Sequence, residues 1–217
     1  MANRQSPRPY AAERRRERAE RERLATQRRV IEAAGRLFRE RGYVATTMND
    51  IAKEAGVALQ SVYNAGRSKS DLLHLVADVA VGGDDRDVAL LDRPNFAAIA
   101  AEPDAVHQVE LIAALIASTL ERVAPVWIAY REAAAVEANA AANLVAAHRR
   151  RHETFAGMIA MILPDGLRLA PGEATSTAWA IGSVDVFLLL REQLGWDSAQ
   201  YADWLRRTLV RELLDTH

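Results

Sequence analysis

A glycine inside a helical pattern, Gly56, constrains the fold of this chain most. It lies in the stretch EAGVALQSVYNAGRSKSDLL, Glu54–Leu73, between two short apolar patterns of helical spacing. Before it, Thr47 and Asp50 have the spacing of a capping box and predict a helix of about two turns. After it, residues 59–65 predict a second short helix. Because glycine adopts positive φ without a steric penalty, we expect Gly56 to form the turn that sets the second helix across the first.

Such a pair is a helix-turn-helix, in which the second helix projects an outer face from the body. We expect Ile51, Ala52, Val57 and Val62 to hold the pair together. Glutamine and asparagine side chains pair with adenine, serine is adaptable, and leucine contacts the thymine methyl group. The outward residues that are candidates for contacts to base edges are Leu59, Gln60, Ser61 and Asn64.

Three residues near helix ends are candidates for phosphate contacts, because hydroxyl, phenol and ammonium groups at such positions bind anions. These are Thr47, Tyr63 and Lys69. Each also has a purely structural interpretation: Thr47 as a cap, Tyr63 as a packing residue against the preceding helix, and Lys69 as a solvated lysine. The three together, on a basic segment, favour binding to DNA.

The charges of the chain are divided unevenly along its length. Residues 1–70 hold 16 Lys and Arg against 8 Asp and Glu, a net charge of +8, whereas residues 71–217 have a net charge of −9. The basic N-terminal third indicates an anionic partner. The chain contains no cysteine, which excludes disulfides and thiolate metal sites.

The remaining sequence has helical periodicity and no alternation of period two, so the expected fold class is all-α, with about nine to ten helices. A first long helix is expected from Leu24 to Arg41, ending at Gly42. The expected domains are a basic N-terminal arm, disordered or helical, at 1–23, a helix-turn-helix domain at 24–70, and a C-terminal regulatory and dimerisation domain at 71–217. Beyond VGGDDRD at 81–87, further helices are expected near 92–101, 104–123, 125–137, 139–163, 172–194 and 198–215.

The segment LFRERGYVATTMNDIAKEAGVALQSVYNAGRSKSDLL resembles the N-terminal DNA-binding domain of TetR-type transcriptional regulators. The shared features are a glycine and an apolar pair, Thr-Thr, Asp-Ile-Ala, Ala-Gly-Val, Val-Tyr, and Ser-Lys before a leucine pair. The resemblance is specific over about residues 24–75. It implies a homodimer that binds a palindromic double-stranded DNA operator, most often as a repressor, and is released by a small-molecule effector, which we expect to be apolar or amphipathic.

Two positions depart from the family pattern. Gly66 stands where an aromatic residue usually follows the recognition helix, and Ala58 stands where a serine often caps that helix. The loss of a cap costs about 1 kcal/mol, and the loss of an aromatic side chain removes packing. We therefore expect a looser DNA-binding domain than is usual.

The resemblance also implies a dimer interface built by the last two helices. Its expected residues are Trp179, Val184, Phe187, Leu188, Trp204, Leu205 and Leu209, with the monomer core as the alternative role. A stripe of aromatic, methionine and charged residues in the middle helices is the expected effector lining, although such a stripe is more often core. It comprises Trp127, Tyr130, Arg131, Phe155, Met158 and Met161.

Two other classes of function compete with a DNA-binding regulator. An all-helical enzyme would need a catalytic constellation, but no recognisable catalytic motif, phosphate loop or metal site is present, so we expect no catalytic residue, cofactor or metal. His148 and His152 lie four residues apart amid a basic run, which favours a solvated face over a metal site. A helical adaptor that kept the helix-turn-helix without binding DNA is the other alternative. Apolar runs are too short to span a membrane, so we expect a cytoplasmic, nucleoid-associated protein without a membrane partner.

Overall fold

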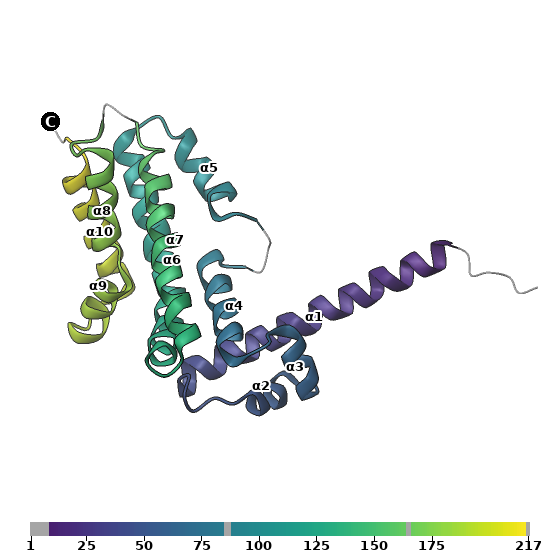
Figure 1. The fold of residues 1–217 in the computed structure, drawn as a ribbon. Coiled ribbons are helices and arrows are strands. Elements are labelled where there is room, and N and C mark those ends of the chain that lie inside the picture. The colour runs from purple at the N-terminus through teal and green to yellow at the C-terminus, as the bar shows by residue number, and fades with distance from the viewer. Residues whose placement is uncertain (1–8, 85–87, 164–165, 216–217) are drawn as a thin grey trace, which may run out of the picture. The chain divides into compact units, whose positions relative to one another are not determined.

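The computed structural model describes residues 9–84, 88–163 and 166–215, with side chains from Glu13 onward. Within these ranges the all-α prediction is confirmed, and the one β-type pairing is an isolated bridge between Leu167 and Leu214 (Figure 1). The chain divides into two compact units, an N-terminal unit that ends at Val76 and a C-terminal unit that begins at Ala77. This division falls inside a helix, a few residues beyond the domain boundary expected at 70.

The N-terminal unit packs three helices against one another: α1 (Pro9–Arg41), α2 (Met48–Ala55) and α3 (Leu59–Ala65). The first two turns of α4 (Lys69–Gly82) complete it. Of the four apolar residues predicted to hold the pair together, Ile51 and Val62 are 0% exposed and Ala52 is buried, whereas Val57 is half-buried. The core of this unit comprises Val30, Ala33, Ala34, Leu37, Phe38, Tyr43, Ile51, Val62, Leu72 and Leu73.

The first helix begins at Pro9, so the helix expected from Leu24 extends back through the arm, for which a helical state was one of the two expectations. Residues 13–25 are all exposed, and they have no apolar stripe that packing could use. The helix continues there because arginine and glutamate are good helix formers and pair along it. Two such pairs are Arg18 with Glu22 at 2.8 Å and Arg23 with Glu20 at 2.6 Å. Of the expected arm, residues 9–23 are therefore helical, and residues 1–8 lie outside the described range.

The predicted turn at Gly56 is confirmed. Its φ of 63° and ψ of 41° are left-handed, and its N–H donates to carbonyls of the last turn of α2. The N–H of Val57 then bonds the carbonyl of Ala52 at 3.0 Å, which closes the helix end. A side chain with a Cβ would be strained in this conformation. Gly56 therefore fixes the direction in which the chain enters α3.

Gly66 has a different role from the one its sequence position suggested. Its φ of −146° and ψ of 125° are extended, so this position does not require glycine for its backbone conformation. It is buried, and a Cβ placed on it would lie 2.6 Å from Cδ2 of Leu72. Leu72 thus lies against Gly66 and leaves no room for a side chain at this position, while the expected looseness of the domain stays a prediction.

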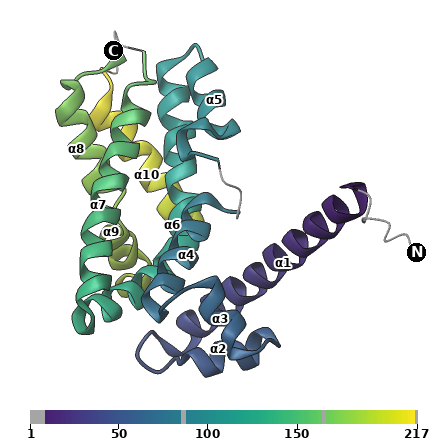
Figure 2. The ribbon, with the colours of Figure 1, turned by 45° about the vertical axis from the view of Figure 1, so that its right-hand side comes forward.

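The C-terminal unit is a helical bundle with α6 (Ala105–Val136) at its centre. This helix packs against α5 (Pro94–Ala101), α7 (Ala138–Ile159) and α10 (Ser198–Leu213), while α8 (Pro171–Ile181) packs against α7 and α10 (Figures 1 and 2). Shorter elements complete the unit: a 3₁₀ turn η1 (Leu90–Asp92), α9 (Val184–Leu188) and a π-helical segment η3 (Leu189–Gln193).

The helix α6 runs without interruption through Pro125, where the sequence predicted a break between two helices. Proline lacks an N–H and removes the bond to the carbonyl four residues earlier, that of Glu121. The helix persists because residues on both sides of Pro125, including Val123 and Trp127, are buried against the bundle. By length and composition alone α6 is apolar enough to cross a membrane, and half of that apolar window is buried inside the unit, as in the core helix of a bundle.

A further predicted helix, 172–194, is broken in the structure between α8 and α9. Gly182 ends α8, and the Ser183 hydroxyl accepts a bond from Val186 N at 3.2 Å to cap α9. Arg151 of α7 donates to the carbonyls of Trp179 and Gly182, both at 2.7 Å. The last carbonyls of a helix have no partner within the helix, and the Arg151 bonds supply one here. These bonds thereby stabilise the break between α8 and α9.

We expect Gly66→Ala to loosen the N-terminal unit. The added methyl group meets Leu72 at 2.6 Å, and overpacking of this kind costs about 1–3 kcal/mol. Hydrogen–deuterium exchange in α2 and α3 should therefore become faster. Gly172→Ala is the matched control, because nothing lies within 4 Å of a Cβ at that position. Unchanged exchange in Gly66→Ala would show that Leu72 moves aside freely.

Candidate nucleic-acid interface and ligand site

The outer face of α3 presents the predicted base-reading residues to solvent. Leu59 is 37% exposed, Gln60 and Asn64 are exposed, and Ser61 is half-buried. Gln60 Nε2 donates to Asn64 Oδ1 at 3.1 Å, so the two amide side chains lie side by side one turn apart. Of the seven residues of α3, Val62 alone is buried, so most of the surface of this helix is available to a partner.

Thr47 is fully engaged as a helix cap. Its hydroxyl donates to Asp50 Oδ2 at 2.6 Å and accepts from Asp50 N at 3.1 Å, and its own N–H donates to Asp50 Oδ2 at 3.0 Å. These bonds lower the pKa of Asp50, with the hydroxyl bond as the largest cause. The capping-box prediction is confirmed. A phosphate contact by Thr47 stays a prediction and would require the hydroxyl proton to leave Asp50.

Lys69 also has an internal role. Its ammonium donates to the carbonyls of Tyr43 at 2.9 Å and Thr46 at 3.0 Å, and it lies 4.1 Å from the centre of the Tyr43 ring. An ammonium has three donors, so these two bonds leave one for a phosphate oxygen. The purely structural alternative, a solvated lysine, therefore does not describe Lys69. Its bonds tie the loop between α1 and α2 to the start of α4.

Tyr63 is 43% exposed at the end of α3, with its phenol available for contact. Exposed basic side chains lie on the same unit, among them Lys53 of α2 and Arg67 after α3. Arg36 of α1 instead pairs with Glu54 of α2 at 3.1 Å. The unit thus combines polar side chains on α3 with basic side chains around them. This combination suits a nucleic acid, which has anionic phosphates and base edges with hydrogen-bond donors and acceptors.

Most residues of the predicted effector lining lie in the core of the C-terminal unit. Tyr130, Met158 and Phe155 are 1%, 3% and 5% exposed, Trp127 is 9% exposed, and Met161 is half-buried against the same core. Burial raises the pKa of Tyr130. Arg131 is on the surface, where it pairs with Asp185 at 3.1 Å.

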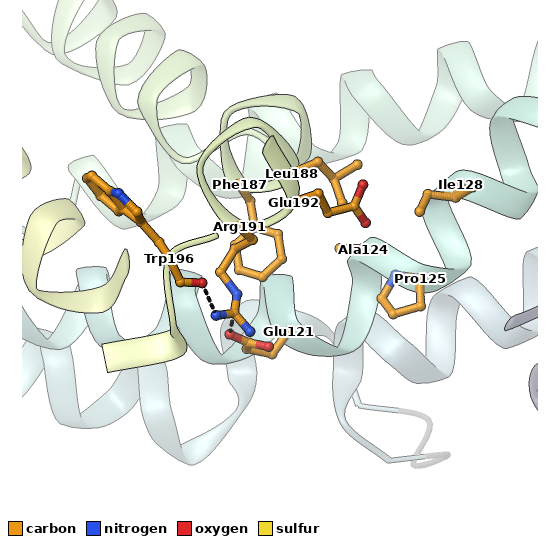
Figure 3. Close-up of a pocket in the computed structure, with 9 residues that line it drawn as sticks. All are labelled: Glu121, Ala124, Pro125, Ile128, Phe187, Leu188, Arg191, Glu192 and Trp196. Atoms are coloured by element: carbon orange, nitrogen blue, oxygen red, sulfur yellow. Dashed lines mark hydrogen bonds and ion pairs between the residues drawn. The ribbon is translucent and has the colours of Figure 1, made fainter. Parts of the chain in front are cut away.

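A groove of about 320 Å³ lies elsewhere in the C-terminal unit, and sequence reasoning missed it. Figure 3 shows α6 side chains on one side and those of α9 and η3 on the other. Arg191 donates to the carbonyl of Trp196 and lies 3.6 Å from Glu121. The residues that line the groove are Glu121, Ala124, Pro125, Ile128, Phe187, Leu188, Arg191, Glu192 and Trp196. The groove was missed because its two walls lie about 60 residues apart in the sequence.

The residues predicted for a dimer interface fall into two sets. Val184, Phe187, Leu205 and Leu209 are at most 4% exposed and belong to the monomer core. Trp179, Leu188 and Trp204 are half-buried at its margin. The first four residues therefore have a role in the monomer core. The other three keep exposed apolar surface that a second copy could contact.

Metal ligands were not expected, and no group of three or more His, Cys, Asp or Glu in the described parts of the chain could hold a metal ion. His148 and His152 instead lie beside aromatic rings. The His148 ring is 5.1 Å from that of Trp127, and the His152 ring is 5.9 Å from that of Trp179.

Comparisons with known proteins agree with this geometry. Residues 30–76 match the model of the bacterial regulatory proteins of the tetR family. None of the curated proteins matches the chain.

Solved structures share the fold at low sequence identity. One is a protein described as a transcriptional regulator from Saccharomonospora viridis, in complex with choline (TM-score 0.67, 19% identity, 89% of this chain and 100% of that one). The regulator FadR from Bacillus subtilis, in complex with stearoyl-CoA, has a TM-score of 0.64 and 18% identity over 85% of this chain and 97% of its own. A TetR transcription regulator from Haloarcula marismortui has a TM-score of 0.64 and 16% identity over 88% and 100%.

Lys69→Met should destabilise the N-terminal unit even without DNA. The methionine keeps much of the packing on Tyr43 but leaves two carbonyls without their donor, at a cost of about 1–3 kcal/mol. Hydrogen exchange at the end of α1 and the start of α2 reports this loss. Lys53→Met, at an exposed lysine of α2, is the control and should leave exchange unchanged. Equal exchange in the two variants would mean that the Lys69 bonds contribute nothing.

Proposed function

We propose that this chain represses transcription by binding an operator. Its N-terminal unit matches the DNA-binding domain of the TetR family, and its fold is that of the family's transcriptional regulators. In this proposal it acts in the cytoplasm, on the nucleoid, as a homodimer on a palindromic site. A small molecule bound in the C-terminal unit releases it from DNA.

The observation that carries this proposal is the outer face of α3. Gln60 and Asn64 are exposed and lie one turn apart on a helix that Gly56 sets across α2. Both amide side chains can pair with adenine in the major groove. Tyr63 and the third donor of Lys69 are the proposed phosphate contacts, with Thr47 as a further one.

The dimer part of the proposal rests on the margin of the C-terminal core. Trp179, Leu188 and Trp204 are half-buried there, and Leu189 and Leu194 are 48% and 62% exposed. Apolar side chains at such exposure suit an interface with a second copy. Two copies would supply two recognition helices, as a palindromic operator requires.

Effector binding is supported by the ligands of proteins that share the fold, choline in one case and stearoyl-CoA in another. The chain passes from one unit to the other within α4. A molecule that changes the packing of the C-terminal unit can therefore act on the DNA-binding unit through this helix, provided that it binds the two states with different affinity.

The direct test is recovery of genomic fragments bound by the purified protein, followed by gel shifts on the recovered DNA at moderate salt. We expect retention of a short set of sequences with inverted symmetry, and release of these by some compounds in a screen. Sequence-independent retention, or none, would instead support the adaptor.

Gln60→Ala and Asn64→Ala should each weaken operator binding by about 1–3 kcal/mol and relax the preference at particular base pairs. Tyr63→Phe should weaken binding to all sequences by about 0.5–1.5 kcal/mol, because it removes one neutral donor. Fluorescence anisotropy on the operator and on single-base variants separates the two effects. An unaltered base preference in both amide variants would place base recognition on other residues.

Leu188→Arg should yield monomers in light scattering, because it places a charge in the proposed interface. Val145→Arg is the control, at an exposed position of α7. Leu188→Arg should bind the operator far more weakly than the control, since a single recognition helix reads half of the site. A dimer that survives would move the interface to another surface.

A further inference from the structure

Arg151 is half-buried in the C-terminal unit, and the hydrogen-bond partners of its guanidinium are neutral. One of its nitrogens donates to the carbonyls of Trp179 and Gly182. Its central carbon lies 4.6 Å from the centre of the Phe155 ring and 5.3 Å from that of Trp179. Burial lowers the pKa of Arg151 to about 10, since withdrawal from water disfavours the charged form. Arginine nonetheless stays charged at neutral pH.

A negative charge to match this cation is missing from the described residues. Asp185 acts on Arg151 through space, but its carboxylate pairs with Arg131 at 3.1 Å, and no described carboxylate lies within ion-pair distance of Arg151. A charge withdrawn from water is costly unless an opposite charge accompanies it. Carbonyl oxygens supply only dipoles, so the guanidinium is hydrogen-bonded but not neutralised.

Three polar atoms of the same unit are buried without a hydrogen-bond partner among the described residues. They are the Tyr201 hydroxyl, Trp179 Nε1 and His148 Nδ1. Tyr201 is 1% exposed, and the Arg151 charge acts on its hydroxyl. Buried polar groups of this kind normally have a partner. The indole N–H can only donate, and the phenol can donate.

Ring contacts link most of these residues, and Tyr201 is linked to Arg151 by the effect of its charge; we call the group the Arg151 cluster. The His148 ring lies 5.1 Å from the Trp127 ring and 6.3 Å from the Trp179 ring. The cluster comprises Trp127 of α6, His148, Arg151 and Phe155 of α7, Trp179 of α8 and Tyr201 of α10. It therefore draws on four helices and combines aromatic faces with donors around one cation.

We propose that the Arg151 cluster is the effector site and that the effector is a monocarboxylate with an apolar or aromatic body. This rests on the proposed function and specifies its ligand class. A carboxylate offers an acceptor to the donors of Tyr201 and Trp179, which have none among the described residues, and it supplies the charge that the carbonyls lack. A water molecule would satisfy the hydroxyl but bring no charge. One guanidinium matches one negative charge, which favours a carboxylate over a doubly charged phosphate.

Carboxylate binding at this place has a consequence for the fold. The acid competes with the carbonyls of Trp179 and Gly182 for Arg151, and these carbonyls stand at the break between α8 and α9. Binding therefore changes how the end of α8 is held. Trp179 and Leu188, on either side of this break, belong to the proposed dimer interface.

The probes are matched compounds that differ only in the head group: 4-phenylbutyrate, 4-phenylbutanamide and 4-phenylbutylamine, and a series of linear carboxylates from butyrate to dodecanoate with their amides. Calorimetry and quenching of tryptophan fluorescence on the full-length protein give the affinities. We expect at least one acid to bind roughly tenfold or more tightly than its amide, and the amine to bind most weakly. If no acid in either series binds more tightly than its amide, the proposal is wrong.

Tyr201→Phe is the sharpest variant, because it removes a hydroxyl that has no internal partner. We expect an unchanged or higher Tm without ligand, and a loss of roughly ten- to hundredfold in affinity for the acid, as for a hydrogen bond to a charged group. A lower Tm without ligand would show that the hydroxyl is already satisfied in the folded protein, and would overturn the proposal.

Arg151→Gln should abolish the preference for acid over amide. Arg149→Gln is its matched control, an exposed arginine two residues earlier on the same helix. An unaltered preference in Arg151→Gln would also overturn the proposal. Operator binding is measured separately on the same variants. Acid binding without DNA binding would contradict the proposed function alone, whereas DNA binding without acid preference would contradict only this inference.

Discussion

The left-handed backbone at Gly56 is the constraint on which the N-terminal unit depends. It ends α2 after eight residues and sets α3 across it, so that Val62 alone anchors α3 to the core while Gln60 and Asn64 face outward. The neighbouring contacts support this geometry. Lys69 ties the loop between α1 and α2 to α4, and Leu72 closes over Gly66. The unit is therefore held by backbone conformation and a few buried contacts, which leaves the polar face of α3 exposed for the proposed contact with DNA.

The C-terminal unit has a different constraint, because the polar groups inside its apolar bundle need hydrogen-bond partners. Gln108 is 1% exposed and bonds the carbonyls of Ile99 and Met161 and the N–H of Leu163, so all of its polar atoms are used. Arg151, Tyr201 and Trp179 contrast with this, since the cation has neutral partners and the other two have none among the described residues. The same unit thus contains one satisfied polar group and one cluster that is not. The effector that we propose would supply the charge and the acceptors that this cluster lacks.

Local signals in the sequence predicted the N-terminal unit well. The capping box at Thr47, the left-handed Gly56 and the outward Gln60 each depend on residues within a few positions, and all are present in the structure. Features set by distant contacts were not predictable in this way. Packing carries α6 through Pro125, Leu72 fills the space at Gly66, and Arg151 stabilises the break after α8 from another helix. The groove beside Glu121 and the Arg151 cluster likewise join residues far apart in the chain. The roles of Val184, Phe187, Leu205 and Leu209 could not be separated in advance, since an apolar stripe suits a core and an interface equally.

In the function that we propose, two copies of this chain present two α3 helices to successive turns of one DNA duplex. Hydroxyl-radical footprinting of the wild-type protein on a recovered fragment measures this directly. The account predicts two protected segments related by inverted symmetry, with centres about 10–10.5 base pairs or a multiple of this apart. A single protected segment, or uniform protection without symmetry, would contradict it.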